Sequence, residues 1–110
     1  MTTVDPQLLE EIKADQGVTW SDAVTDSRFS THIANGMAYI DKRLGEAGDY
    51  KAPGDARTLL FEYVRYARAG ALDVFENNYR HIILDAQNTR RIARYGKEQP
   101  ARRGKYPNSV

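Results

Sequence analysis

The stretch Tyr63 to Arg80, YVRYARAGALDVFENNYR, decides how the second half of this 110-residue chain folds. It places Arg65 and Arg68 among aromatic residues, continues through the small residues Ala69-Gly70-Ala71, and then reaches Asn77-Asn78. Arginines between aromatics are typical of nucleic-acid-binding surfaces. They also occur on a protein helix that packs on more than one side, and the small residues favour such close packing.

A helix over residues 55–76 places the apolar residues of this stretch on one broad face. With a step of about 100° per residue from Leu60, the main arc is expected to face the preceding long helix. It contains Tyr63, Val64, Ala67, Gly70, Ala71, Val74 and Phe75. One shoulder holds Phe61 and Leu72 beside Arg65 and Arg68, and the other holds Leu59 and Tyr66. The arginines therefore flank a packing face. The apolar residues on both shoulders are expected to pack against a further helix or another protein.

Asn78 would lie in the middle of that packing face if the helix continued unbroken. A buried amide without a partner is costly. We therefore predict a turn at Asn77-Asn78, followed by another helix from about Tyr79 through Asn88.

Two further helices precede this region. Apolar residues at steps of four, four, three and four predict an amphipathic helix that is capped by Thr25 or Asp26 and ends before Gly45. Its stripe is Phe29, Ile33, Met37, Ile40 and Leu44. In VDPQLLEEIKADQG, Asp5 as cap, Pro6 at the first helical position and Gly17 beyond the end predict a short helix. Trp20, in the following loop, is expected to anchor that loop on the core.

We therefore expect an all-α fold, a small helical bundle with two long antiparallel helices, a short N-terminal helix and a further helix after the turn near 77–78. The chain is the size of one domain. Residues 1–95 are assigned to the helical domain and 96–110 to a basic, disordered C-terminal tail. Without cysteine, and with no apolar run near about 20 residues, it is expected to be soluble and cytosolic.

Charge is divided along the chain. Residues 1–85 carry nine Lys or Arg against fourteen Asp or Glu, a net charge of −5, whereas residues 86–110 carry seven against one, a net charge of +6. A basic cluster of this kind meets nucleic acid or an acidic protein surface, or is simply solvated. The cluster is Arg90, Arg91, Arg94, Lys97, Arg102, Arg103 and Lys105.

The sequence offers no catalytic constellation. His32 and His81 stand alone and are expected to be structural, because metal sites need three or four convergent ligands. Asp15, Asp22 and Asp26 lack the ligand spacing of a calcium loop and are better explained as caps and solvated charges. We expect no enzyme activity, no metal and no cofactor.

The segments WSDAVTDSRFSTHIANGMAYIDKRLG and GDARTLLFEYVRYARAGALDVFENNYRHIILD carry a resemblance to a known family. In the order of their parts, a TD cap, a helix ending YIDKRLG, a glycine-containing loop and the ARTLLFEYVRYARAGALDVFENNY segment, the chain resembles the head-to-tail connector proteins of long-tailed phages and prophages. These are also called adaptor or head-completion proteins. The resemblance covers about residues 18–90 and rests on helix packing patterns.

The resemblance implies a structural virion protein that is assembled in the bacterial host cytoplasm and located at the head–tail interface. Its copies would form a ring beneath the portal protein, extend the channel for DNA without reading its sequence, and support a downstream head-completion or tail protein. Neighbouring copies would meet through one contact made by Phe61, Arg65, Arg68 and Leu72. Leu59 and Tyr66 would make another such contact or pack on the short N-terminal helix. By position, the cluster from Arg90 to Lys105 would reach the portal or the DNA channel. No membrane contact is implied.

The alternative is a small helical nucleic-acid-binding protein that acts through its basic tail. The cluster supplies charge for this function, yet the sequence shows neither a recognition helix nor a stacking platform.

Overall fold

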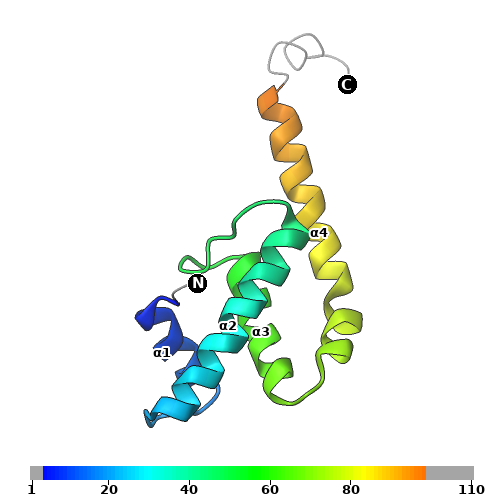
Figure 1. Ribbon diagram of the computed structural model, residues 1–110. Coiled ribbons are helices and arrows are strands. Elements are labelled where there is room, and N and C mark those ends of the chain that lie inside the picture. Colours follow the sequence, from blue (N-terminus) through cyan, green and yellow to red (C-terminus); the bar gives the residue numbers. More distant parts are fainter. Residues whose placement is uncertain (1–3, 99–110) are drawn as a thin grey trace.

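The computed structural model describes residues 4–98 and is all-helical within them (Figure 1). The four helices are α1 (Pro6–Asp15), α2 (Ala23–Leu44), α3 (Asp55–Arg68) and α4 (Leu72–Glu98). Helices α2, α3 and α4 pack together, and α1 lies on α2 and α3. The predicted all-α bundle is therefore confirmed. No helix of the described part is both long and apolar enough to cross a membrane.

Helix α1 begins and ends as the sequence predicts. The Asp5 side chain accepts a hydrogen bond from the Leu8 backbone N–H at 3.3 Å, and Pro6 occupies the first helical position. Leu8 and Ile12 are buried on the face turned toward the core. Gly17, with a φ of 78°, follows in the turn that leaves the helix.

Helix α2 begins earlier than predicted. Asp22, in an extended conformation, caps it by accepting hydrogen bonds from the backbone N–H and the hydroxyl of Thr25, both at 2.8 Å. These bonds stabilise the ionised carboxylate and lower the pKa of Asp22. Asp26, one of the two predicted caps, instead accepts a hydrogen bond from Lys13 of α1. The predicted cap, Thr25 or Asp26, is therefore wrong, and Asp22 is the residue that caps α2.

The buried ammonium of Lys13 attaches α1 to the start of α2. Its side chain is 1% exposed, and its Nζ lies 2.7 Å from Asp26 Oδ1 and 3.1 Å from Ser21 Oγ. The hydrogen bond to Asp26 favours the charged form and raises the pKa of Lys13. Val18 is buried in the same connection, whereas Trp20 is 56% exposed. The prediction that Trp20 anchors the loop is wrong, because Val18 and Lys13 already fill that position.

The predicted stripe of α2 forms the centre of the core. Phe29, Ile33, Ile40 and Leu44 are buried there, and Met37 is partly buried. Helix α3 comes closest at Gly36. A Cβ at that position would lie 2.7 Å from Tyr63 Cδ1 and 2.8 Å from Leu60 Cδ1, so a larger residue would push the two helices apart.

The connection between α2 and α3 is held by its own hydrogen bonds. Asp41 accepts bonds from the Tyr50 hydroxyl and from the Gly48 backbone N–H. Tyr50 is buried, and burial together with the bond to Asp41 raises its pKa. Arg57 of α3 donates to the Tyr50 carbonyl oxygen at 3.0 Å. This segment therefore follows a fixed path over one end of α2 and α3.

The chain turns between α3 and α4 at Gly70, and the prediction of a turn at Asn77-Asn78 is wrong. Gly70 has a φ of 70°, in the left-handed region, and nothing lies within 4 Å of the position its Cβ would take. Both asparagines are exposed within α4. Gly70 thus ends a helix and does not mediate close helix packing, so the predicted arc over residues 60–75 does not form one continuous face.

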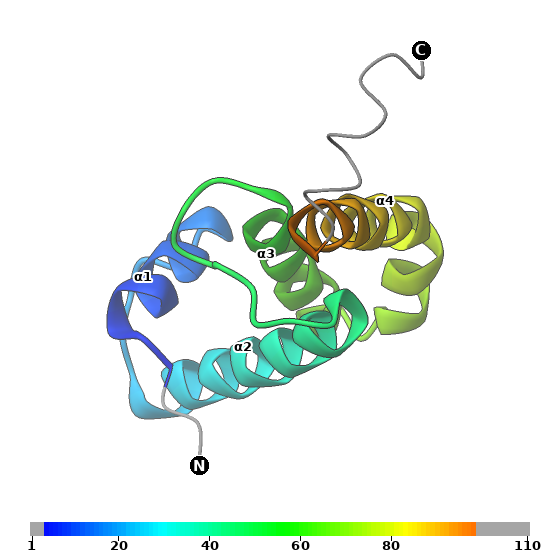
Figure 2. The same ribbon diagram turned by 90° about the horizontal axis from the view of Figure 1, so that it is seen from above.

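Helix α4 doubles back along α2 and α3 and then extends past them (Figures 1 and 2). Its first half buries Phe75, Ile83 and Ala86. The Phe75 ring lies 5.1 to 6.1 Å from four tyrosine rings, those of Tyr39, Tyr63, Tyr66 and Tyr79. The segment HIILD lies within this helix.

The assigned domain boundary at residue 95 falls inside α4, which continues to Glu98. The predicted tail from residue 99 onward lies outside the described residues.

Candidate functional site

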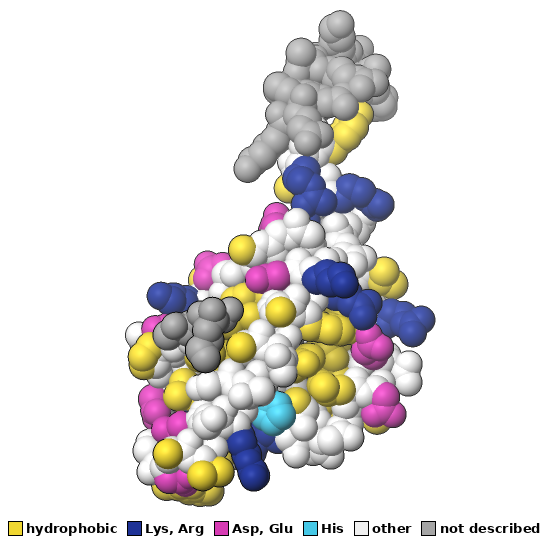
Figure 3. Space-filling model, viewed as in Figure 1, with side chains coloured by type: hydrophobic (Ala, Val, Ile, Leu, Met, Phe, Trp, Pro, Cys, Tyr) yellow, Lys and Arg dark blue, Asp and Glu magenta, His cyan; other side chains and the backbone are white. Residues whose placement is uncertain are grey.

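A surface groove between the C-terminal half of α2 and the middle of α4 gathers most of the described features that suggest binding. It consists of two adjoining hollows of about 400 and 500 Å³. Figure 3 shows apolar side chains between these helices with Lys or Arg side chains beside them. We call it the basic groove. Its lining residues are Tyr39, Arg43, Leu44, Gly45, Glu76, Arg80, Ile83, Leu84, Gln87, Asn88, Arg91 and Arg94.

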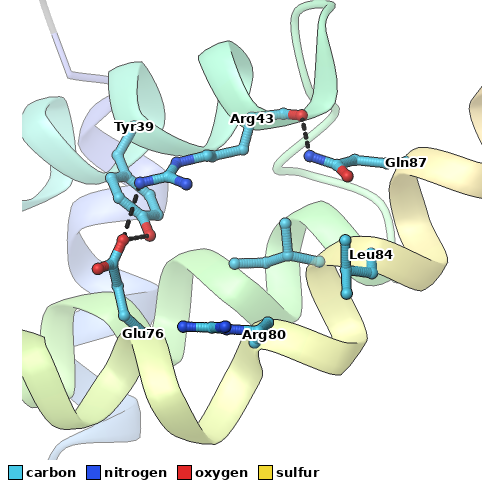
Figure 4. A pocket seen from close by; sticks show the side chains of 7 residues that line it. Tyr39, Arg43, Glu76, Arg80, Leu84 and Gln87 are labelled. Atoms are coloured by element: carbon cyan, nitrogen blue, oxygen red, sulfur yellow. Dashed lines mark hydrogen bonds and ion pairs between the residues drawn. The ribbon is translucent and has the colours of Figure 1, made fainter.

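One end of the basic groove is closed by a hydrogen-bonded group of three side chains. Glu76 Oε2 accepts from the Tyr39 hydroxyl at 2.7 Å and from the Arg43 guanidinium at 2.8 Å (Figure 4). The Arg43 guanidinium also lies 4.5 Å from the centre of the Tyr39 ring. Burial and the bond to Glu76 raise the pKa of Tyr39 to about 12. Tyr39 therefore remains a neutral donor at physiological pH, and Glu76 neutralises Arg43.

The middle of the basic groove presents an apolar side chain beside an arginine. Leu84 is 55% exposed. One turn further along α4, Gln87 donates a hydrogen bond to the Arg43 carbonyl oxygen at 2.8 Å (Figure 4). Arg80 stands next to Leu84 on the same wall (Figure 4). Among the side chains that the structure describes, Arg80 has no carboxylate within ion-pair distance. An acidic, partly apolar surface would complement this part of the groove.

Residues 91–98 of α4 project from the bundle, and we call them the α4 arm; its Arg91 and Arg94 also line the second hollow of the basic groove. All side chains described there, from Arg91 to Tyr95, are exposed. Ile92 is 62% exposed and Tyr95 is 52% exposed. Arg91 pairs with Asn88 at 2.6 Å, and Arg94 lies 3.8 Å from Glu46. The arm therefore offers apolar and cationic side chains together.

Arg90 belongs to the packed part of the protein. Its guanidinium donates to both carboxylate oxygens of Asp55, at 2.8 and 2.9 Å, and to Glu46 at 2.9 Å. These bonds raise the pKa of Arg90 and lower that of Asp55. With 16% of its side chain exposed, Arg90 fastens α4 to the start of α3. Its assignment to portal docking or the DNA channel is corrected accordingly.

The other members of the predicted docking cluster divide into three groups. Arg91 and Arg94 lie on the α4 arm and are exposed. Lys97 falls within α4. Arg102, Arg103 and Lys105 lie outside the described residues.

Of the predicted subunit contacts, the two arginines of the α3 shoulder are engaged by α1. Arg65 donates to Asp15 at 3.0 Å, and Arg68 donates to Gln16 at 2.7 Å. The Arg68 guanidinium also lies 4.6 Å from the centre of the Phe29 ring. Helix α1 thus contacts part of the predicted interface, while Arg65 remains 50% exposed.

The apolar members of the predicted interface are mostly internal. Leu59 is fully buried, so its assignment to a surface contact is corrected. Tyr66 packs edge-on against Phe75 of α4, and Phe61 is partly buried. Leu72, at the start of α4, is 37% exposed. The second shoulder is therefore covered by α4, because the chain reverses at Gly70.

The sequence reading missed the basic groove because it ended the last helix near Asn88. Arg80, Leu84, Arg91 and Tyr95 follow one another by four, seven and four residues, which places them on one side of a continuous helix. This spacing is visible in the sequence once the helix is extended.

The described residues suggest binding more than chemistry. No group of three or more His, Asp or Glu side chains among them could hold a metal ion. His32 is partly buried, and burial together with the nearby Arg68 lowers its pKa. His81 is exposed on α4. Comparisons with protein-family models, with curated proteins and with solved structures find no match to this chain.

Proposed function

We propose that the protein is a structural phage subunit that forms a connector ring between the capsid portal and the tail or the next head-completion protein. The single observation that supports this most is the α4 arm. It extends from a compact helical body and exposes Ile92 and Tyr95 beside Arg91 and Arg94. The family resemblance of the sequence supplies the identity of the partner.

The arm has the properties of a docking element. A helix that is exposed all round and still carries large apolar side chains gains stability when a partner groove buries them. The neighbouring arginines restrict the partner to an acidic or polar-rimmed surface. Arg90 holds the base of the arm through Asp55, so little ordering entropy is lost at that point when the arm binds.

In this role the body forms the wall of a ring, the arm engages the portal, and DNA passes through the ring without sequence-specific recognition. The ring is part of the virion and is assembled in the host cytoplasm. Its far face supports the downstream head-completion or tail protein. Such a role requires no cofactor.

Electron microscopy of the cognate portal with added protein tests the proposal directly. We expect ring density at the portal with the unmodified chain and none with Ile92→Asp. Val24→Asp is the matched control, because Val24 is also 62% exposed but lies at the start of α2. Circular dichroism should show that both variants remain folded. Absence of added density with the unmodified chain would reject the proposed function.

The second candidate, nucleic-acid binding, is favoured by the cationic side chains Arg80, Arg91 and Arg94 on one side of α4. It predicts duplex binding that weakens steeply with salt and falls when Arg91 and Arg94 are both replaced by Gln. Salt-dependent binding of this kind, together with no portal association, would favour the second function over the first.

A further inference from the structure

Helices α1 and α4 lie on opposite flanks of the body. Helix α1 packs against α2 and α3 and makes no contact with α4. Figure 2 shows α1 at one side of the bundle and α4 at the other, with α3 between them and α2 running along one edge. Any surface on α1 therefore faces away from the basic groove of the same molecule.

The α1 flank is acidic. Residues 5–15 carry Asp5, Glu10, Glu11 and Asp15 against the single cation Lys13. Because the Lys13 side chain is 1% exposed and turned toward Asp26, its charge contributes little to the outer surface. The Glu10 side chain is 62% exposed. Glu11 and Asp15 pair with Arg57 and Arg65 of α3, each at 3.0 Å, so Glu10 is the most exposed of these paired carboxylates on the outer side of α1.

The opposite flank is basic. Residues 80–94 carry Arg80, Arg90, Arg91 and Arg94 against Asp85. Arg90 is neutralised by Asp55, but Arg80 and Arg91 are exposed at the rim of the basic groove, on either side of the exposed Leu84. The two flanks therefore carry opposite charge and lie back to back.

We infer that the basic groove of one copy binds the α1 flank of a second copy. Two identical basic grooves would repel each other, so a two-fold symmetric contact through this groove is disfavoured. A contact between two different faces repeats from copy to copy and closes into a ring when the rotation allows. The inference rests on the proposed ring and names the two faces that build it.

Two observations favour a protein surface over a nucleic-acid backbone in this groove. Leu84 places an apolar side chain at its centre, where a phosphate would gain nothing. Glu76 pairs with Arg43, so this end of the groove offers a phosphate no unpaired cation. Helices α1 and α4 already contact α3, so the inferred contact uses the flanks of α1 and α4 that face away from it.

A charge exchange between the flanks tests the inference. The groove variant carries Arg80→Glu and Arg91→Glu, so both of its flanks are acidic. The α1 variant carries Gln7→Lys and Glu10→Lys, so the net charge of residues 5–15 changes from −3 to 0. In sedimentation at low salt, the unmodified chain should self-associate, the groove variant should remain monomeric, and an equimolar mixture of the two variants should associate again.

The control carries Lys42→Glu and Lys51→Glu, which give the same change in net charge as the groove variant at exposed positions that neither line the basic groove nor belong to α1. It should associate like the unmodified chain. A monomeric unmodified chain at low salt, a groove variant that associates normally, or a mixture that does not recover would each overturn the inference.

Disulfide trapping provides a second measurement that detects weak contacts. The chain has no cysteine, so single cysteines introduced at Glu10 and at Arg91 in separate chains report on one contact. Under mild oxidation, the mixture of the Glu10→Cys and Arg91→Cys chains should form a disulfide between positions 10 and 91. This dimer should form faster than the dimer of either variant alone. Equal rates in all three samples would contradict the assigned faces.

These experiments use the protein without a portal. Self-association through the two flanks, together with a failure to bind the portal, would reject the proposed function and retain the inference. Portal-bound rings that form equally well with the groove variant would reject the inference and retain the proposed function.

Discussion

The packed first part of α4 and its exposed end have opposite surroundings. From Leu72 to Arg90 the helix buries Phe75, Ile83 and Ala86 against α2 and α3, and Arg90 closes this region through Asp55. From Arg91 onward each described side chain is exposed. One uninterrupted helix therefore serves first as core and then as a free arm. The comparison teaches that the Arg90–Asp55 ion pair, and no break in the helix, marks the boundary between the packed and the exposed part of α4.

The two parts of α4 should differ most in how much a truncated side chain lowers the free energy of unfolding. Phe75→Ala removes a ring that is 1% exposed and contacts several tyrosines, and it should lower the free energy of unfolding by about 3 to 5 kcal/mol. Ile92→Ala in the arm should change it by less than about 0.5 kcal/mol. Urea denaturation of both variants measures the contrast. Equal losses would show that the arm is packed in solution.

The boundary itself should have an intermediate effect. Arg90→Ala removes the bonds to Asp55 and Glu46 and should lower the free energy of unfolding by about 2 kcal/mol, since hydrogen bonds to charged groups are among the stronger ones. Arg91→Ala, one residue further along, should leave it within about 0.5 kcal/mol. Chemical denaturation at pH 7 compares them. A neutral Arg90→Ala would mean that α4 is held without the ion pair.

The same boundary should weaken in acid. Arg90 lowers the pKa of Asp55 in the folded protein, whereas the unfolded carboxyl titrates near its ordinary value of about 4. The stabilisation is therefore present above that value and is lost as the pH falls through the lowered folded-state pKa. The difference in unfolding free energy between the unmodified chain and Arg90→Ala should shrink below about pH 4. A difference independent of pH would contradict the Asp55 contact.

The smallest effect concerns where α4 begins. Gly70→Ala should cost about 1 kcal/mol, because Gly70 has a left-handed φ of 70°. Asn77→Ala should stabilise by a few tenths of a kcal/mol, because Asn77 is exposed inside a helix. Thermal unfolding checks both signs. Were residues 55–76 one helix, Gly70→Ala would stabilise instead.

Local patterns were sufficient for the elements whose signals lie close together in the chain. The Asp5 cap with Pro6 predicted α1, and the stripe from Phe29 to Leu44 predicted the core face of α2. Gly70 was misread because a glycine between small residues is consistent both with close helix packing and with a helix end. The Asn77-Asn78 pair was misread because exposed asparagines are tolerated in a helix whose other face is buried.

The candidate site was less accessible from sequence, because its residues come from distant segments. Arg90 is paired with Asp55 and Glu46, which lie 35 and 44 residues away, so it could not be told apart from the solvated arginines that follow it. The basic groove joins Arg43 of α2 to Arg80 of α4 and exists only because the chain reverses at Gly70. The arginines that line the groove could be identified in the sequence, but their position beside α2 depends on the chain reversal at Gly70.

Lys13 makes the docking of α1 directly measurable by chemical labelling. Between residues 4 and 95 the lysines are Lys13, Lys42 and Lys51, and Lys13 is buried whereas the other two are exposed. An amine-reactive acylating reagent modifies exposed lysines at once, but it reaches Lys13 only when α1 lifts away from Asp26. The ratio of these labelling rates, read by mass spectrometry, reports how often the N-terminal helix detaches.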